Sequence, residues 1–283
     1  MAIFTNQATL IYNGQSTSSN VTTGEILTGL SLTKTAITDT YGKDGRVVYI
    51  VTVANAGGAV TGATLTDDLG GYAVGANTVY PLTYTAGSLI YYQNGAPATG
   101  AVAAGGPPLV ITGIDIPAGG NVQLIYEATT NEYTPNALGA SVINTAELTG
   151  GGINEPLTDT ATVDAAADVA LTIAKAVCPA VVNDDGTLTY TFIIQNAGNT
   201  EVPATDDLVV TDTFNPILNP ITVTLNGTVL AEGTEYTYDE TTGVFATLPG
   251  VISVPAATYV QDPVSGVYSA TPGVSVLTVT GTV

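Results

Sequence analysis

The stretch LSLTKTAITDTYGKDGRVVYIVTVANAGGAVTGATLTDDL (residues 30–69) decides the fold. Val, Ile, Thr and Tyr alternate with other residues in short runs, which are separated by an Asp-Gly turn and an Asn-Ala-Gly turn. Alternation bounded by turn residues is typical of short strands, and the stretch shows no sustained helical periodicity. It therefore predicts an all-β chain of the sandwich type.

The same pattern returns in LTIAKAVCPAVVNDDGTLTYTFIIQNAGNTEVPATDDLVVTDTF (171–214). Further along, IDIPAGGNVQLIYEA (114–128) is paralleled by ISVPAATY and GVSVLTVTGTV (within 252–283), with a hairpin-like insertion between them. An internal repeat of this length indicates two copies of one structural unit. We predict two tandem sandwich domains, at residues 27–166 and 167–283.

The two copies differ at their ends. The first continues with ASVINTAELTGGGINEPLTDTATVDA (140–165), which predicts a closing hairpin, whereas the second stops at Val283 without one. The N-terminal segment 1–26 matches the missing hairpin. Its residues Asn6, Ala8 and Leu10 correspond to Asn144, Ala146 and Leu148. The second domain is therefore expected to lack its last two strands, and the chain carries a spare pair at its other end.

The spare hairpin is expected to complete a different molecule. Thr23–Gly29 connects it to the first strand of domain 1 and spans roughly 25 Å at most, which is too short to pass a sandwich domain. We expect the hairpin to enter domain 2 of a neighbouring copy by β-strand complementation. Such a contact is head-to-tail and grows into a filament unless it closes into a ring. The alternatives are a small cap packed on domain 1 and a floppy tail.

Composition excludes several classes of function. The 283 residues include 4 Lys and Arg against 24 Asp and Glu, which gives a net charge of −20. This charge argues against binding nucleic acid or anionic lipid, which need basic surface. It favours solubility through self-repulsion, with weak cation binding by acidic loops as the alternative.

Other absences point the same way. The chain has no His and a single cysteine, Cys178, so it lacks the usual general base and any intrachain disulfide. We therefore expect no enzyme activity, no cofactor and no metal site. MAIFTNQATL contains no basic region followed by a long apolar run, and no run approaches about 18 apolar residues. We expect no Sec signal peptide and no membrane span.

Lysine is rare, yet two lysines occupy matching places in the repeat, in LSLTKT and LTIAKA. Side chains alternate between the two faces of a strand, so each Lys shares a face with core residues. The same parity applies to one Asp and one Asn of each completed domain. The intrachain set is Lys34, Asp67 and Asn144; the interchain set is Lys175, Asp212 and Asn6 of the next subunit.

These residue types can form an isopeptide bond. Burial disfavours the charged forms of a Lys–Asp pair, so the amine becomes a neutral nucleophile and the acid can shuttle protons. Lysine is then joined to the asparagine side chain as ammonia leaves. The alternative is an unreacted buried Lys–Asp pair with Asn as a hydrogen-bond partner.

The Leu-Thr-Lys first strand, the NAGG and NAGNT turns, the strand ends LTDDL and VTDTF, and the closing strands NTAEL and NQATL together resemble a known family. It is the bacterial and archaeal surface-repeat family catalogued as domain of unknown function eleven. The resemblance covers nearly the whole chain. It implies immunoglobulin-like sandwiches, an extracellular location and a structural role without catalytic turnover.

We therefore predict the subunit of an extracellular filament on a cell or spore surface, a homo-polymer assembled by donor-hairpin exchange. Isopeptide bonds are expected to lock it. The alternatives are an adhesin whose loops bind a carbohydrate or a host protein, and a subunit of a flat surface layer.

Overall fold

The computed structural model describes residues 2–26 and 29–283 and confirms the all-β fold. Its described residues form strands and one short 3-10 helix, η1 (Ala204–Asp206), with no α-helix among them. The chain divides into two compact units. The first comprises Met1–Pro135, Gly139–Ala165 and Pro263–Val267; the second comprises Asn136–Leu138, Ala166–Asp262 and Tyr268–Val283. We call their sandwiches domain 1 and domain 2.

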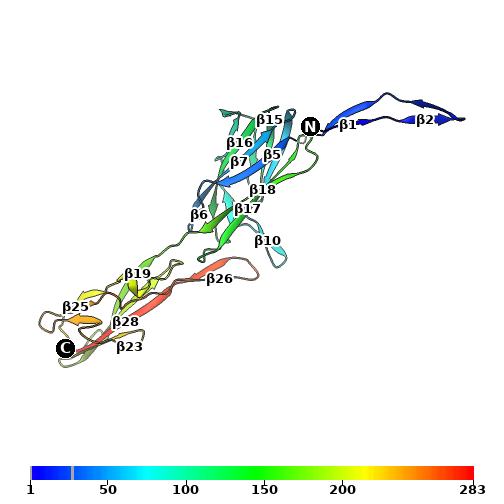
Figure 1. The fold of residues 1–283 in the computed structure, drawn as a ribbon. Helices are drawn as coiled ribbons and strands as arrows, with labels where there is room; N and C mark the ends of the chain where they lie inside the picture. Colours follow the sequence, from blue (N-terminus) through cyan, green and yellow to red (C-terminus); the bar gives the residue numbers. More distant parts are fainter. Residues whose placement is uncertain (1, 27–28) are drawn as a thin grey trace. The chain divides into compact units, whose positions relative to one another are not determined.

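Domain 1 consists of two six-stranded sheets packed face to face (Figure 1). In the first sheet the order is β13-β12-β16-β7-β5, with β11 also paired to β16; in the second it is β14-β15-β8-β17-β18-β6. The first sheet contains β5 (Leu30–Ala36), β7 (Arg46–Asn55), β11 (Leu82–Tyr84), β12 (Ile90–Gln93), β13 (Ala96–Pro97) and β16 (Asn121–Thr130). The second contains β6 (Thr40–Tyr41), β8 (Val60–Asp67), β14 (Val102–Ala104), β15 (Leu109–Ile116), β17 (Ser141–Gly150) and β18 (Leu157–Ala165). A separate hairpin is formed by β9 (Tyr72–Val74) and β10 (Asn77–Val79).

The core of domain 1 follows from alternation. Every second side chain of β7 and β16 is buried, and these side chains pack against the inward faces of β8, β15 and β17. Burial of this apolar surface is the main source of folding free energy. The closing strands β17 and β18 complete the second sheet, since β17 lies between β8 and β18.

The Asn-Ala-Gly turns are built alike in the two domains. Asn55 donates from Nδ2 to the Gly58 carbonyl at 2.7 Å and accepts from the Gly57 N–H at 2.8 Å. Asn196 donates to the Thr200 carbonyl at 2.7 Å and accepts from the Gly198 N–H at 3.0 Å. The side chain thus satisfies turn groups that the sheet leaves unpaired.

Domain 2 contains a five-stranded sheet, β19-β20-β28-β22-β23, and a three-stranded sheet, β21-β25-β24. The first contains β19 (Leu171–Cys178), β20 (Thr187–Asn196), β22 (Ile221–Leu225), β23 (Thr228–Val229) and β28 (Gly273–Thr282). The second contains β21 (Thr211–Thr213), β24 (Tyr236–Tyr238) and β25 (Val244–Thr247). The sequence insertion forms the hairpin β26 (Thr258–Gln261) and β27 (Tyr268–Thr271).

Two strands that lie beside the closing hairpin in domain 1 have open counterparts in domain 2. The repeat equates β5 with β19 and β8 with β21. In domain 1, β8 is paired on both sides, by β15 and β17, whereas in the described part of domain 2 β21 pairs only with β25. All residues of β19 are exposed, whereas the inward positions of β5 are buried or half-buried.

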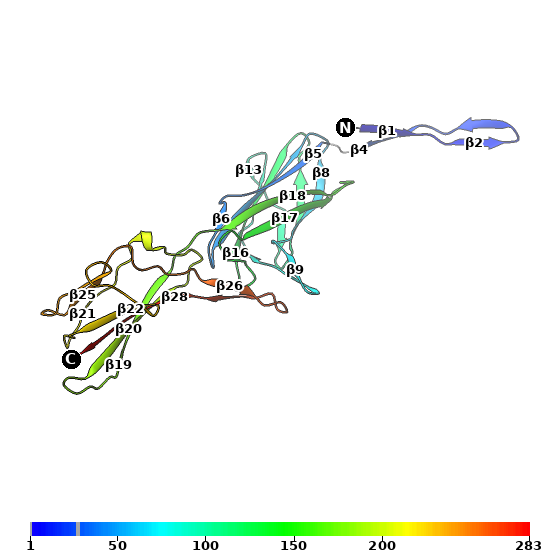
Figure 2. The same ribbon diagram turned by 60° about the horizontal axis from the view of Figure 1, so that its bottom comes forward.

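The N-terminal hairpin pairs with itself alone among the described residues: β1 (Ala2–Asn6) with β4 (Thr22–Ile26), and β2 (Thr9–Tyr12) with β3 (Gln15–Ser18) (Figure 2). Its turn is formed by Asn13 and Gly14, whose φ angles of 48° and 80° suit a tight hairpin turn. The apolar side chains Leu10, Ile11 and Tyr12 are 66%, 72% and 74% exposed, so neither face of the hairpin tip is covered.

Candidate functional site

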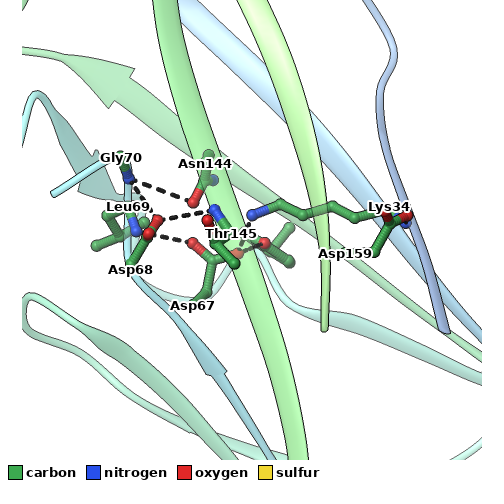
Figure 3. A network of polar contacts seen from close by, with 9 residues as sticks. Lys34, Asp67, Asp68, Leu69, Gly70, Asn144, Thr145 and Asp159 are labelled. Carbon is green, nitrogen blue, oxygen red and sulfur yellow. Dashed lines mark hydrogen bonds and ion pairs between the residues drawn. The ribbon is translucent and has the colours of Figure 1, made fainter. Parts of the chain in front are cut away.

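The core of domain 1 brings three of the candidate residues together. Lys34 comes from the middle of β5, Asp67 ends β8 and Asn144 lies on β17. The Lys34 Nζ lies 2.5 Å from Asp67 Oδ2, and neither side chain is exposed. Figure 3 shows the Lys34 amine pointing toward the Asp67 carboxylate and the Asn144 amide. The Lys34 amine, the Asp67 carboxyl group and the Asn144 amide therefore share one site that is buried from solvent.

The Asp67 carboxylate is held from two sides. The Leu69 N–H donates to Oδ1 at 3.0 Å, and the Tyr126 hydroxyl donates to Oδ2, the oxygen that also pairs with Lys34. Burial raises the pKa of Tyr126 well above its ordinary value, so the phenol keeps its proton. Sequence analysis missed Tyr126, because an inward tyrosine on a strand has the pattern of any packing residue.

The Asn144 amide is incompletely bonded. Its Oδ1 accepts the Gly70 N–H at 3.3 Å, whereas its buried Nδ2 has no hydrogen-bond partner among the described residues. The Tyr49 hydroxyl is buried without a partner as well. Burial raises the pKa of Tyr49, and the polar side chain of Asn144 nearby lowers it in part. The two side chains do not, however, meet the geometry of a hydrogen bond. An unpaired buried polar group costs about 1–3 kcal/mol.

Burial also acts on the amine. It lowers the pKa of Lys34 below the ordinary lysine value, and the charge of Asp67 opposes that shift only in part. The amine lies 4.8 Å from the centroid of the Tyr49 ring. The closing strand β18 covers this position, because Asp159 accepts the Lys34 backbone N–H at 2.7 Å. Burial thus shifts the Lys34 amine toward its neutral form, in the same site as the Asn144 amide (Figure 3).

The equivalent site of domain 2 is open. Lys175 pairs with Asp212, but their side chains are 39% and 18% exposed. The Lys175 amine lies 4.6 Å from the Tyr190 ring centroid and within 5.5 Å of those of two phenylalanines. Val279 stands opposite Tyr190, where domain 1 has Tyr126 opposite Tyr49. Within the described part of the chain, Asp212 therefore lacks the tyrosine donor that Asp67 has.

Asn6, the third interchain candidate, lies on β1 opposite Thr22 and is exposed. No hydrogen bond among the described residues joins it to Lys175 or Asp212. Beside the pair in domain 2 is an apolar groove of about 180 Å³ between β19 and the segment before β21. Its lining includes Leu171, Ile173, Ile194, Leu208 and Val210.

Within residues 2–26 and 29–283, no three His, Cys, Asp or Glu side chains are grouped as metal ligands. Cys178 is exposed and unpaired. No helix in that part of the chain is long and apolar enough to cross a membrane.

No protein-family model and no curated protein sequence matches the chain. BcpA, the major pilin subunit of Bacillus cereus, is 13% identical over 95% of this chain and 73% of that one, with a TM-score of 0.38. The pilus backbone RrgB from Streptococcus pneumoniae is 10% identical over 86% of this chain and 55% of that one, with a TM-score of 0.33.

The full-length major pilin SpaD from Corynebacterium diphtheriae is 13% identical, with a TM-score of 0.36. The match covers 57% of this chain and spans only 41% of the SpaD chain. At TM-scores this low the likenesses carry no argument about function.

Replacing each aspartate by alanine distinguishes the closed site from the open one. Asp67→Ala leaves Lys34 buried without its partner and should lower the free energy of unfolding of domain 1 by about 3–5 kcal/mol. Asp212→Ala should cost domain 2 of the free subunit less than about 1 kcal/mol, because Lys175 is 39% exposed and solvent screens its pair. Differential scanning calorimetry of both variants measures the two losses. Equal losses of stability would contradict the conclusion that the site in domain 1 is closed and the site in domain 2 is open.

Proposed function

We propose that this chain is the structural subunit of an extracellular filament, in which the N-terminal hairpin of one subunit completes domain 2 of the next. Two exposed surfaces support the proposal. The hairpin exposes apolar side chains on both faces, and domain 2 exposes β19 and the free edge of β21. Free strand edges readily pair with another chain.

The hairpin has the dimensions of the missing part. From Ala2 to Ile26 it spans 25 residues, as many as the closing hairpin of domain 1 from Ser141 to Ala165. Asn6 pairs across the hairpin with Thr22, and Asn144 pairs likewise with Ala161. Each Asn therefore lies on the first strand of a hairpin, with its partner 16 residues further along the chain for Asn6 and 17 for Asn144.

Chain connections favour an intermolecular partner. The hairpin joins domain 1 at Leu30, where β5 begins, whereas the chain leaves domain 1 after Ala165, which pairs with Tyr41 just beyond the other end of β5. Residues 27–29 reach at most roughly 10 Å, less than the roughly 33 Å of a ten-residue strand such as β7. From this short connection we infer that the hairpin enters domain 2 of another copy, and such a contact propagates head-to-tail.

The same proposal includes a covalent lock in domain 1. The Lys34 nitrogen attacks Asn144 Cγ, Asp67 relays the protons, and the bond from Cγ to Nδ2 breaks. One amide bond and one ammonia are formed, so no outside reactant is needed. The observation that carries this step is Asn144 Nδ2, a buried atom without a hydrogen-bond partner in the described residues. Its departure as ammonia removes the cost of leaving it unpaired.

The second lock joins subunits. Insertion of the hairpin places Asn6 at the position that Asn144 has in domain 1, beside Lys175 and Asp212. The incoming strands then bury a lysine that is half-exposed in the free subunit. Burial disfavours the charged amine, so bond formation follows assembly.

A structural role without turnover accords with these features, and we place the filament at the cell or spore surface. The adhesin alternative has one observation in its favour. Domain 1 has an open pocket of about 480 Å³, lined in part by Tyr80, Tyr84 and Tyr133. A filament subunit can carry such a pocket, so the two roles are compatible.

Deletion of residues 1–22 tests the donor role. The shortened chain should remain unassembled, because domain 2 of each molecule lacks a donor, and electron microscopy of concentrated samples should show no filaments. Asn6→Ala is the matched control, since it keeps the hairpin and removes only the reactive amide. It should still assemble. Filaments formed by the deleted chain would contradict the proposed function.

Covalent locking is tested by boiling assembled material in SDS with reductant. We expect a ladder of multimers and a mass deficit of about 17 Da, one ammonia, for each bond. Lys175→Arg should reduce the ladder to a monomer that still lacks one ammonia from domain 1. Lys34→Arg should keep the ladder and lose that deficit. A monomer of full mass from the unaltered chain would overturn both bonds and leave strand pairing as the sole link.

A further inference from the structure

The groove of domain 2 has a filled counterpart in domain 1. The repeat equates its lining residues Leu171, Ile173 and Val210 with Leu30, Leu32 and Leu65. Those three pack in the same hydrophobic cluster as Leu148 of the closing strand β17, which is fully buried. The N-terminal residue that corresponds to Leu148 is Leu10, which is 66% exposed. In domain 1 the Leu148 side chain thus occupies the position that is an empty groove in domain 2.

Strand pairing in domain 1 gives the register for the missing strand. There Leu148 stands opposite Leu65, and Ala146 stands opposite Asp67. The equivalent pairs between a donor and domain 2 are Leu10 with Val210 and Ala8 with Asp212.

The hairpin keeps the spacing that this register needs. The pairing register shifts by one residue between the pairs Asn6↔Thr22 and Thr9↔Ser18. The first strand advances three residues between these pairs, from 6 to 9, whereas the return strand advances four, from 18 to 22. The extra residue therefore lies on the return strand. From Asn6 to Leu10 the sequence keeps the same four-residue step as β17 has from Asn144 to Leu148, although in the free hairpin Gln7 and Ala8 separate β1 from β2.

We propose that Leu10 of a second copy of this chain is the anchor of the donor strand, seated in the groove of domain 2 opposite Val210. The inference rests on the proposed function and specifies its register. A groove of about 180 Å³ is large enough, since an apolar cavity of about 150 Å³ accepts benzene. With Leu10 seated, Ala8 faces Asp212 and Asn6 lies two residues further along, as Asn144 does beyond Ala146.

The neighbouring residue provides a matched control. Thr9 corresponds to Glu147, an exposed carboxylate on β17, so Thr9 faces solvent in the proposed register. Leu10→Glu and Thr9→Glu add the same charge to adjacent exposed residues of the free hairpin. Neither should change the melting of the free subunit, because the hairpin tip contacts no core.

The two variants should differ in assembly. Leu10→Glu forces a carboxylate into an apolar groove and should weaken subunit association by at least about a hundredfold. Thr9→Glu should change it by less than about threefold. Sedimentation of mixtures with unaltered subunits measures both. Equal effects of the two substitutions would overturn the assignment of Leu10 as the anchor.

Cysteine pairs test the register itself, in a Cys178→Ser background. The Val210 carbonyl accepts the Thr247 N–H, and the Val210 N–H donates to the Thr247 hydroxyl. Both backbone groups of Val210 thus point away from the incoming strand, so a Leu10–Val210 pair is a non-hydrogen-bonded pair, in which side chains approach most closely. Leu10→Cys with Val210→Cys should form an intersubunit disulfide, detected after non-reducing digestion with pepsin and mass spectrometry. Leu10→Cys with Leu208→Cys or with Asp212→Cys should not.

The outcomes separate the register from the function. A disulfide to position 208 or 212 in assembled filaments overturns the register and leaves donor complementation intact. Filaments without any of these disulfides overturn the register too. If the chain lacking residues 1–22 still forms filaments, assembly does not use the hairpin. That result overturns the proposed function and the register with it.

Discussion

A β-sandwich is stable when the apolar inner faces of its two sheets cover each other, so a strand missing from one sheet leaves part of the core exposed. Domain 1 meets this constraint within the chain, because β17 and β18 close its second sheet and cover Lys34. Domain 2 has a packed core, but among the described residues of a single chain one part stays uncovered: β19 is exposed along its length, and β21 has one free edge. The N-terminal hairpin is exposed as well. In the proposed filament the hairpin of one subunit covers the open part of domain 2 in the next, so both surfaces are buried together.

The two lysine sites show what closure does to chemistry. The same Lys–Asp pair is fully buried in domain 1 and partly solvated in domain 2. Removing water strengthens the preference for a neutral amine, so in this account reactivity depends on the covering strands. A bond that forms only after the hairpin arrives would make assembly irreversible without joining subunits that have not yet docked.

Sequence alone predicted the all-β fold, because alternation and turn residues are local signals that the sheets of both domains obey. Strand parity also indicated that Lys34, Asp67 and Asn144 share inward faces, since the period of a strand is fixed by its backbone. It gave no sign of Tyr126, whose hydrogen bond to Asp67 depends on how two sheets pack. The unpaired Asn144 Nδ2 and the groove beside β19 likewise come from three-dimensional packing. The chemical roles of the candidate residues and the boundaries of the domains stay predictions.

Complementation in trans tests the central claim most directly. A peptide of residues 1–26 is titrated into the chain that lacks them, and binding is followed by calorimetry together with the melting of each domain. We predict one peptide bound per chain and a higher melting temperature for domain 2, with domain 1 unchanged. Absence of binding, or stabilisation of domain 1 in place of domain 2, would contradict it.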